Sequence, residues 1–147
     1  MGRVVTAFVP FLPLSVLSPN RGERRGGRVP EDISDAKRQL RGDWALWLLE
    51  HDAVRAVQQP FERARVTLTM RCQDAHAVRP SDGVYRPTDV GNAVYALKAG
   101  IDGLIDAGLI IDDDWRHVPE LVGRIERVYD RASEGVLVEV EELEADD

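Results

Sequence analysis

The stretch that decides the fold is residues 88–108, TDVGNAVYALKAGIDGLIDAG. Asp89 or Asn92 can cap a helix here, because a side-chain oxygen at that position accepts a hydrogen bond from an unpaired amide of the first turn. Gly108 suits the end of the helix, since glycine readily adopts the left-handed conformation that follows a last turn. The pattern predicts a helix that runs to Ala107. Its apolar stripe consists of Val94, Leu97, Ile101, Leu104 and Ile105.

A second row on this helix contains only small residues, Ala96, Gly100, Gly103 and Ala107. Glycine costs about 1 kcal/mol in a helix interior, so two glycines in one row indicate that something packs very close. We expect that partner to be either the sheet or the same helix of a second subunit.

The segments on either side of this helix alternate between strand and helix patterns. Residues 63–73, RARVTLTMRCQ, alternate strictly between apolar and polar side chains and predict a strand. Cys72 is thereby expected to be a small core residue. Further elements are predicted over Val4–Val9 (strand), from near Ser34 to before Pro60 (helix) and over 136–142 (strand).

Two features of these segments allow more than one interpretation. Residues 121–129 fit a helix as well as a strand. His51 lies on the apolar face of the helix that begins near Ser34, so we expect a core histidine rather than a catalytic one. That apolar face consists of Leu40, Trp44, Trp47, Leu48 and His51.

The composition is that of one globular domain over residues 1–147, with 44% hydrophobic and 31% charged residues. A single cysteine and three scattered histidines exclude an internal disulfide and a closed zinc site. No apolar run reaches the ~18 residues that a spanning helix requires. Pro10 and Pro13 interrupt the N-terminal apolar run, and no A-x-A cleavage site follows it. We therefore expect a cytoplasmic protein with no membrane partner.

The formal charge of -7 is unevenly distributed. Residues 1–71 hold twelve Lys or Arg against eight Asp or Glu, whereas residues 72–147 hold seven against eighteen. The basic residues cluster in RGERRGGR, within a predicted mobile loop over 18–31, and in KRQLR (37–41). The acidic tail 141–147 is predicted to be frayed. A local electropositive surface that contacts phosphate is compatible with this distribution, although such clusters are more often solvated charge.

Carboxylates gather where the central helix ends, in GLIIDDDWRH (108–117). Cleavage of a phosphodiester needs a nucleophilic water, charge neutralisation at phosphorus and a stabilised leaving oxygen. A Mg²⁺ ion held by a few carboxylates supplies all three, and a lysine can support the phosphate or the water. Plainer interpretations exist: Asp89 as a cap, Lys98 as a solvated helix residue, and the aspartates as a polar turn. The candidate set is Asp89, Asn92, Lys98, Asp112, Asp113 and Asp114.

The order of these residues resembles the RusA-like family of Holliday-junction resolvases, small Mg²⁺-dependent endonucleases of bacteria and their phages. The similarity rests on D-x-x-N-(x)5-K-A-x-I-D-G-L-x-D-A-G-(x)3-D-D-D, over roughly residues 86–117. It extends more weakly to PLSVLSPN (13–20) and to 63–72, and is absent around 34–57. The resemblance implies an α+β fold with a small mixed β-sheet and two main helices, in the order β-α-β-α-β-β, and a two-fold dimer.

The resemblance also implies roles for individual residues. Asp89 matches the first metal-binding aspartate, Asn92 a supporting asparagine and Lys98 the essential lysine. Asp112 and Asp113 match the acidic pair after the helix, with Asp113 at the metal-binding position. Asp89, Lys98 and Asp113 are thus the implied catalytic residues. The implied ligands of Mg²⁺, or of Mn²⁺ as its substitute, are Asp89, Asp112, Asp113 and Asp114.

One position departs from the family pattern. Gly91 stands where the family usually has a second aspartate, which removes a ligand and a negative charge from the metal site. Three outcomes stay open: Asp112 or Asp114 substitutes in an active enzyme, the site holds one ion weakly, or the protein binds DNA without cutting it.

The length of the helix sets a geometric condition. A helix of about sixteen residues is ~24 Å long, so Asp89 and Asp113 start at opposite ends of a rod. Either residues 109–113 fold back along the helix, or two helices pair antiparallel across a two-fold axis and share the site. The residues expected to contact DNA backbone phosphates are Arg21, Arg24, Arg25, Arg28, Lys37, Arg38, Arg41 and Arg116.

The leading hypothesis is a homodimeric, Mg²⁺-dependent endonuclease that resolves branched DNA by paired symmetric nicks. The first alternative is a junction-binding protein that has lost catalysis through Gly91. The second is a small α+β domain that binds a protein partner.

Overall fold

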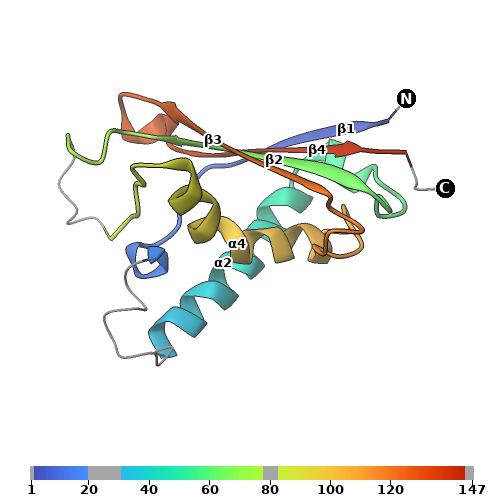
Figure 1. Cartoon of the computed structure of the whole chain (residues 1–147), viewed down its shortest axis with the longest axis horizontal. Helices are drawn as coiled ribbons and strands as arrows, with labels where there is room; N and C mark the ends of the chain where they lie inside the picture. The colour runs from blue at the N-terminus through green and yellow to red at the C-terminus, as the bar shows by residue number, and fades with distance from the viewer. Residues whose placement is uncertain (1, 20–30, 78–82, 145–147) are drawn as a thin grey trace.

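Within the residues that the structure describes, 2–19, 31–77 and 83–144, four strands form one mixed sheet and two long helices lie against one of its faces (Figure 1). In this computed structural model the strand order is β1-β4-β2-β3, with β4 antiparallel to both neighbours and β2 parallel to β3. The expected α+β class, mixed sheet and order of elements are confirmed. The strands are β1 (Val4–Val9), β2 (Ala64–Cys72), β3 (Glu120–Arg127) and β4 (Gly135–Glu142). The helices are α2 (Glu31–Leu49), the one-turn α3 (Asp52–Arg55) and α4 (Val90–Asp106), with 3-10 turns η1 (Ser15–Leu17) and η3 (Arg131–Ser133).

Alternate residues of three strands form the sheet side of the hydrophobic core. Val66 of β2 pairs with Val140 of β4, and Val140 pairs in turn with Val5 of β1. The same alignment repeats further along the strands, and these side chains are all buried. The strand predicted over 63–73 is therefore confirmed, with Cys72 as a buried core residue.

The opposite face of the sheet carries charge. Arg65 of β2 donates hydrogen bonds to Glu120 of β3 and to Glu141 of β4, the latter at 2.6 Å from Nη1. Because these carboxylates lie on both neighbouring strands, one guanidinium links three strands on the face that meets water.

Helix α4 provides the crossover that a parallel strand pair requires. Its N-terminus is capped as predicted, since Asp89 Oδ1 accepts a hydrogen bond from the Asn92 amide at 2.8 Å. Gly108 follows the helix with φ of +81°, the left-handed conformation expected of it. The helix lies so close to β3 that a Cβ on Gly123 would sit 2.5 Å from Val94 Cγ2. Close contact with the sheet thus fixes the height of α4 above β3.

The row of small residues on α4 packs against α2 of the same chain. A Cβ on Gly100 would lie 2.6 Å from the indole ring of Trp44, and one on Gly103 would lie 2.9 Å from the carbonyl oxygen of Arg41. Trp44 itself is fully buried. Neither of the partners expected from the sequence, the sheet or a second subunit, fills this row. A dimer built by pairing two copies of α4 along it is excluded by the position of α2.

Other expectations were met in part. Residues 120–127 form β3, which resolves the ambiguity over 121–129. The frayed tail expected over 141–147 is wrong for Glu141 and Glu142, which belong to β4, and residues 145–147 lie outside the described residues. Trp47 is 43% exposed rather than buried.

His51 has a structural role, as expected. Its Nε2 accepts a hydrogen bond from the Phe8 amide at 3.1 Å, and its Nδ1 lies 3.0 Å from the Trp47 carbonyl oxygen. The imidazole thereby links the end of α2 to the edge strand β1. In the part of the chain that the structure describes, no helix has the length and apolar character needed to span a bilayer.

Candidate functional site

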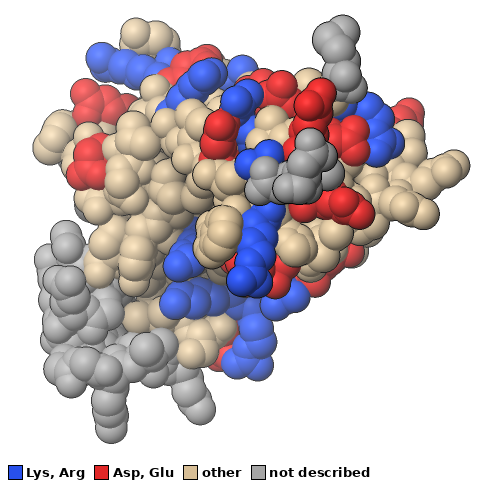
Figure 2. Space-filling view, turned by 45° about the vertical axis from the view of Figure 1, so that its right-hand side comes forward, with Lys and Arg blue, Asp and Glu red and all other residues tan. Residues whose placement is uncertain are grey.

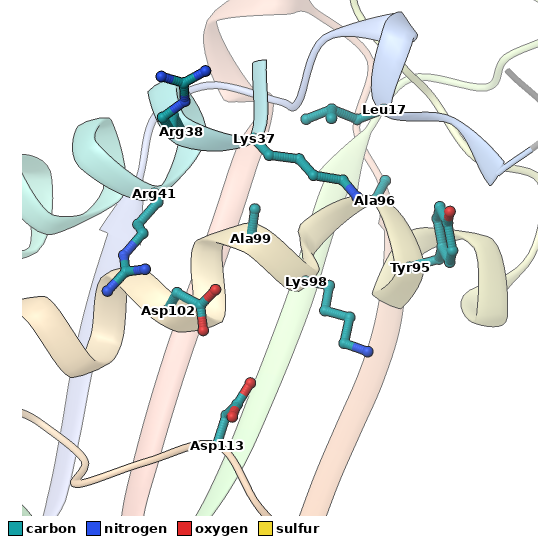
Figure 3. Close-up of a pocket in the computed structure, with 10 residues that line it drawn as sticks. All are labelled: Leu17, Lys37, Arg38, Arg41, Tyr95, Ala96, Lys98, Ala99, Asp102 and Asp113. Carbon is teal, nitrogen blue, oxygen red and sulfur yellow. The ribbon is translucent and has the colours of Figure 1, made fainter. Parts of the chain in front are cut away.

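A hollow of about 490 Å³ lies between α2 and α4, and charged side chains from both helices line it (Figure 3). Figure 2 shows Lys and Arg side chains gathered in a band across the lower middle of one face of the molecule. The hollow contains three basic residues of α2, one lysine and one aspartate of α4, and one aspartate from the segment that follows α4. The lining residues are Leu17, Lys37, Arg38, Arg41, Tyr95, Ala96, Lys98, Ala99, Asp102 and Asp113.

Asp113 reaches this hollow because the chain turns back after α4. Two backbone hydrogen bonds close the turn, from Gly108 N to Ile105 O and from Leu109 N to Leu104 O, each 3.0 Å. Leu109 and Ile110 are then buried, and the Leu109 carbonyl accepts a hydrogen bond from the Phe61 amide at 2.9 Å. The first of the two geometries expected from the sequence, a fold-back of residues 109–113, is the one observed.

In the hollow, Asp113 meets both a lysine and a second carboxylate. Figure 3 shows Asp113 across from Lys98 and Asp102, which are one turn apart on α4. Although Asp113 is exposed, the loss of water on the side that faces the hollow is the main cause that raises its pKa, and the hydrogen bond with Asp112 and the negative charges of Asp102 and Asp112 add to it. Such carboxylate repulsion is relieved when a cation binds between the groups.

The basic side chains of α2 differ in how far they are neutralised. Arg41 donates two hydrogen bonds to Asp106, at 2.7 and 2.8 Å, and this contact lowers the pKa of the Asp106 carboxyl. Arg38 pairs with Asp35 at 2.7 Å on the exposed side of the helix. Within the described ranges, Lys37 and Lys98 form neither an ion pair nor a hydrogen bond. These two ammonium groups are the charges most available to an anion.

Asp89 is engaged in capping α4 and does not line the hollow. Its Oδ1 accepts from the Asn92 amide, and its Oδ2 accepts from Asn92 Nδ2 at 2.9 Å. Nine residues separate it from Lys98, which corresponds to ~13 Å along the helix. The structure therefore brings Asp113 and Lys98 together and leaves Asp89, with Asn92, at the far end of the same helix.

The other two aspartates of the triplet shape the turn that follows. Asp112 Oδ1 accepts a hydrogen bond from the Asp113 amide at 2.7 Å. Asp114 Oδ1 accepts from the amides of Arg116 and His117, both at 3.1 Å. Arg116 stacks on the Trp115 ring at 5.5 Å and lines a different hollow from the basic residues of α2. Asp112 thus contacts the hollow only through its hydrogen bond with Asp113, whereas Asp114 and Arg116 do not line the hollow.

Asp102 is the site residue that the sequence reasoning missed. Its spacing of four from Lys98 would have placed both side chains on one face of the helix, which is the signal that could have found it. Four other predicted DNA contacts, Arg21, Arg24, Arg25 and Arg28, lie outside the described residues.

The donor set suits a Mg²⁺ ion that is shared with a phosphate. In the described part of the chain, no three His, Cys, Asp or Glu side chains come together as a complete metal site. Mg²⁺, however, is usually held by only one or two carboxylates together with waters and substrate phosphates. Asp102 and Asp113 facing one another match that smaller requirement. Asp89 caps α4 and Asp114 closes the turn after Asp113, and neither lines the hollow.

Comparison with known proteins gives no family for this chain, so its function is inferred from the geometry of the hollow. No protein-family model matches the chain, and no curated protein sequence matches it.

Proposed function

We propose that this protein is a Mg²⁺-dependent, structure-selective endodeoxyribonuclease that acts on branched DNA such as four-way Holliday junctions. The observation that carries the proposal is the meeting of Asp113, Lys98 and Asp102 in one hollow whose opposite wall is the basic row of α2. Of these residues, Lys98 and Asp113 are matched by the resemblance to the RusA-like resolvases, whereas Asp102 and the basic row of α2 are added by the structure.

The basic wall accounts for DNA binding. Lys37, Arg38 and Lys98 would contact backbone phosphates, which position the duplex without reading its sequence. Arg41 is already paired with Asp106, so its main contribution is to hold α2 against α4.

The acidic wall accounts for cleavage. Asp102 and Asp113 would hold the Mg²⁺ ion, with Asp112 close enough to strengthen the negative field. A bound Mg²⁺ ion supplies charge neutralisation at phosphorus and an activated water. Lys98 would hold the phosphate in line beside these carboxylates. A homodimer remains part of the proposal, because a two-fold arrangement suits paired nicks in a four-way junction.

The test is cleavage of a labelled synthetic four-way junction in Mg²⁺ and in Mn²⁺. We expect paired nicks from the wild type. In Asp113→Asn and Asp102→Asn the cleavage rate should fall by about 100-fold or more, because removal of one group that stabilises transition-state charge has an effect of this size. Asp52→Asn is the matched control, since that side chain is 97% exposed on α3, away from the hollow. Cleavage that survives in both site variants would refute the assignment.

A second function is favoured by one observation. Asp89 caps α4 ~13 Å along the helix from Lys98 and does not line the hollow, and Gly91 supplies no carboxylate, so fewer carboxylates face the hollow than the resemblance implies. A protein with that deficit would bind junctions without cutting them. Tight junction binding with no nicks in either metal would support it, and no DNA binding at all would favour a domain that binds a protein partner.

A further inference from the structure

A second hollow, of about 480 Å³, adjoins the first on the other side of Lys98. The two hollows share three lining residues, Tyr95, Lys98 and Asp113. The first is lined mainly by charged groups. The second is largely apolar, with Val94, Ile101, Trp115, Val118 and Leu121 in its wall. Lys98 thus stands between a charged hollow and an apolar one.

Two aromatic side chains of the apolar hollow are unusually exposed. Trp115 is 72% exposed and Tyr95 is 53% exposed, whereas Trp44 in the core is fully buried. The guanidinium of Arg116 lies over the Trp115 ring at 5.5 Å, which adds positive charge to that aromatic surface. Large exposed rings beside an apolar hollow are typical of a binding surface rather than of solvated surface.

We infer that this apolar hollow receives an unpaired base of the DNA substrate, stacked on Trp115 and Tyr95, while Lys98 holds the adjoining phosphate. The inference rests on the proposed function and names the feature of DNA that would be selected. A nucleotide has an apolar base and an anionic phosphate, which matches the two hollows joined at Lys98. Bases inside a continuous duplex are stacked and paired, so a base at a branch point, a gap or a single strand enters at a lower cost in unstacking and unpairing.

The test compares two labelled DNA probes by fluorescence anisotropy in buffer with EDTA, so that binding is measured without cleavage. One probe is a four-way junction with unpaired thymines at its centre, and the other is a continuous duplex of equal length. We expect Trp115→Ala to weaken junction binding by about 5- to 150-fold, the range that corresponds to ~1–3 kcal/mol of stacking on one base. Duplex binding should change by less than about twofold, because stacking contributes little to phosphate contacts.

Matched variants separate stacking from general damage. Trp115→Phe keeps an aromatic face and should retain most of the junction binding. Tyr129→Ala removes a ring that is 80% exposed and lies under the Arg127 guanidinium at 5.0 Å, but that lines neither hollow. Tyr129→Ala should therefore leave the affinity for both probes unchanged. Tyr95→Ala should weaken binding of the junction but not of the duplex.

Three results would overturn the inference. The first is an equal effect of Trp115→Ala on junction and duplex, and the second is no effect on either. The third is conversion of a dimer to a monomer by Trp115→Ala in sedimentation, which would make the surface a contact between copies. Cleavage in Mg²⁺ is measured in a separate experiment. If the wild type nicks DNA but binds the junction no better than the duplex, the base site is refuted while the proposed nuclease function stands.

Discussion

Replacing Gly100 with alanine measures how tightly α2 and α4 are packed around the candidate site. Helix propensity alone predicts that this change stabilises the protein by about 1 kcal/mol. The added methyl group, however, would sit 2.6–2.7 Å from three atoms of the Trp44 indole, which is fully buried. Overpacking of a core costs about 1–3 kcal/mol, and a clash with a ring that is enclosed on all sides belongs at the upper end of that range. We therefore expect a net destabilisation of about 1–2 kcal/mol, the difference between the two effects.

Gly42 provides the matched control for this experiment. It lies within α2, and a Cβ there would meet no atom within 4 Å. Gly42→Ala should therefore stabilise the protein by about 0.5–1 kcal/mol, so the two glycines should respond with opposite signs. Urea unfolding followed by circular dichroism measures both changes in unfolding free energy. In thermal unfolding, each kcal/mol should appear as a shift of about 2–4 °C in Tm for a chain of this size.

A third variant locates the cause of the effect. In a Trp44→Leu background the clash is relieved, so Gly100→Ala should approach the stabilisation of about 1 kcal/mol expected from helix propensity, a coupling of about 2–3 kcal/mol. If Gly100→Ala stabilised the wild type as Gly42→Ala does, the close packing of α2 on α4 would be refuted. The position assigned to the basic wall of the hollow would be refuted with it.

Three further predictions address charge and metal binding. Arg41 lowers the pKa of Asp106, so the pair contributes stability that is fully present above about pH 4, the ordinary pKa of an aspartate. The difference in unfolding free energy between wild type and Asp106→Asn should therefore shrink as the pH falls below about 4 and through the lowered pKa. Lys98→Ala should reduce the slope of log binding constant against log salt by about one on any DNA, while Arg55→Ala on α3 should not. Gly91→Asp adds a carboxylate beside Asp89, whose Oδ1 lies 3.4 Å from the added Cβ, but eleven residues from Asp102, ~16 Å along α4, so the Mg²⁺ needed for half-maximal nicking should stay unchanged; a several-fold lower requirement would refute the placement of the ion at Asp102 and Asp113.

Local signals in the sequence were enough to predict the elements that carry the site. Strict alternation predicted β2, and the cap at Asp89 with the stop at Gly108 predicted α4 to within a residue. These features depend on contacts a few residues apart, which a single sequence displays directly. The close packing implied by Gly100 and Gly103 was also inferred correctly.

Contacts between distant segments could not be predicted in this way. The partner of the small-residue row is Trp44, more than fifty residues away in the sequence, and periodicity carries no record of which element fills a groove. The same holds for Asp102, whose role depends on the return of Asp113 along the helix. Residues 120–127 were ambiguous because one face of an edge strand and one face of a helix expose similar mixtures of side chains.

The strand order has a consequence for how the protein is made. β4 comes last in the chain, yet it lies between β1 and β2 and pairs with both. On the ribosome, β1 and β2 emerge early and cannot join each other through native hydrogen bonds until residues 135–142 have been synthesised. Pairings such as Val4 with Glu141 span nearly the whole chain, and such long-range closure is slow. The sheet that supports α4 is therefore completed only after translation of β4, and the nascent chain carries two unsatisfied strand edges until then.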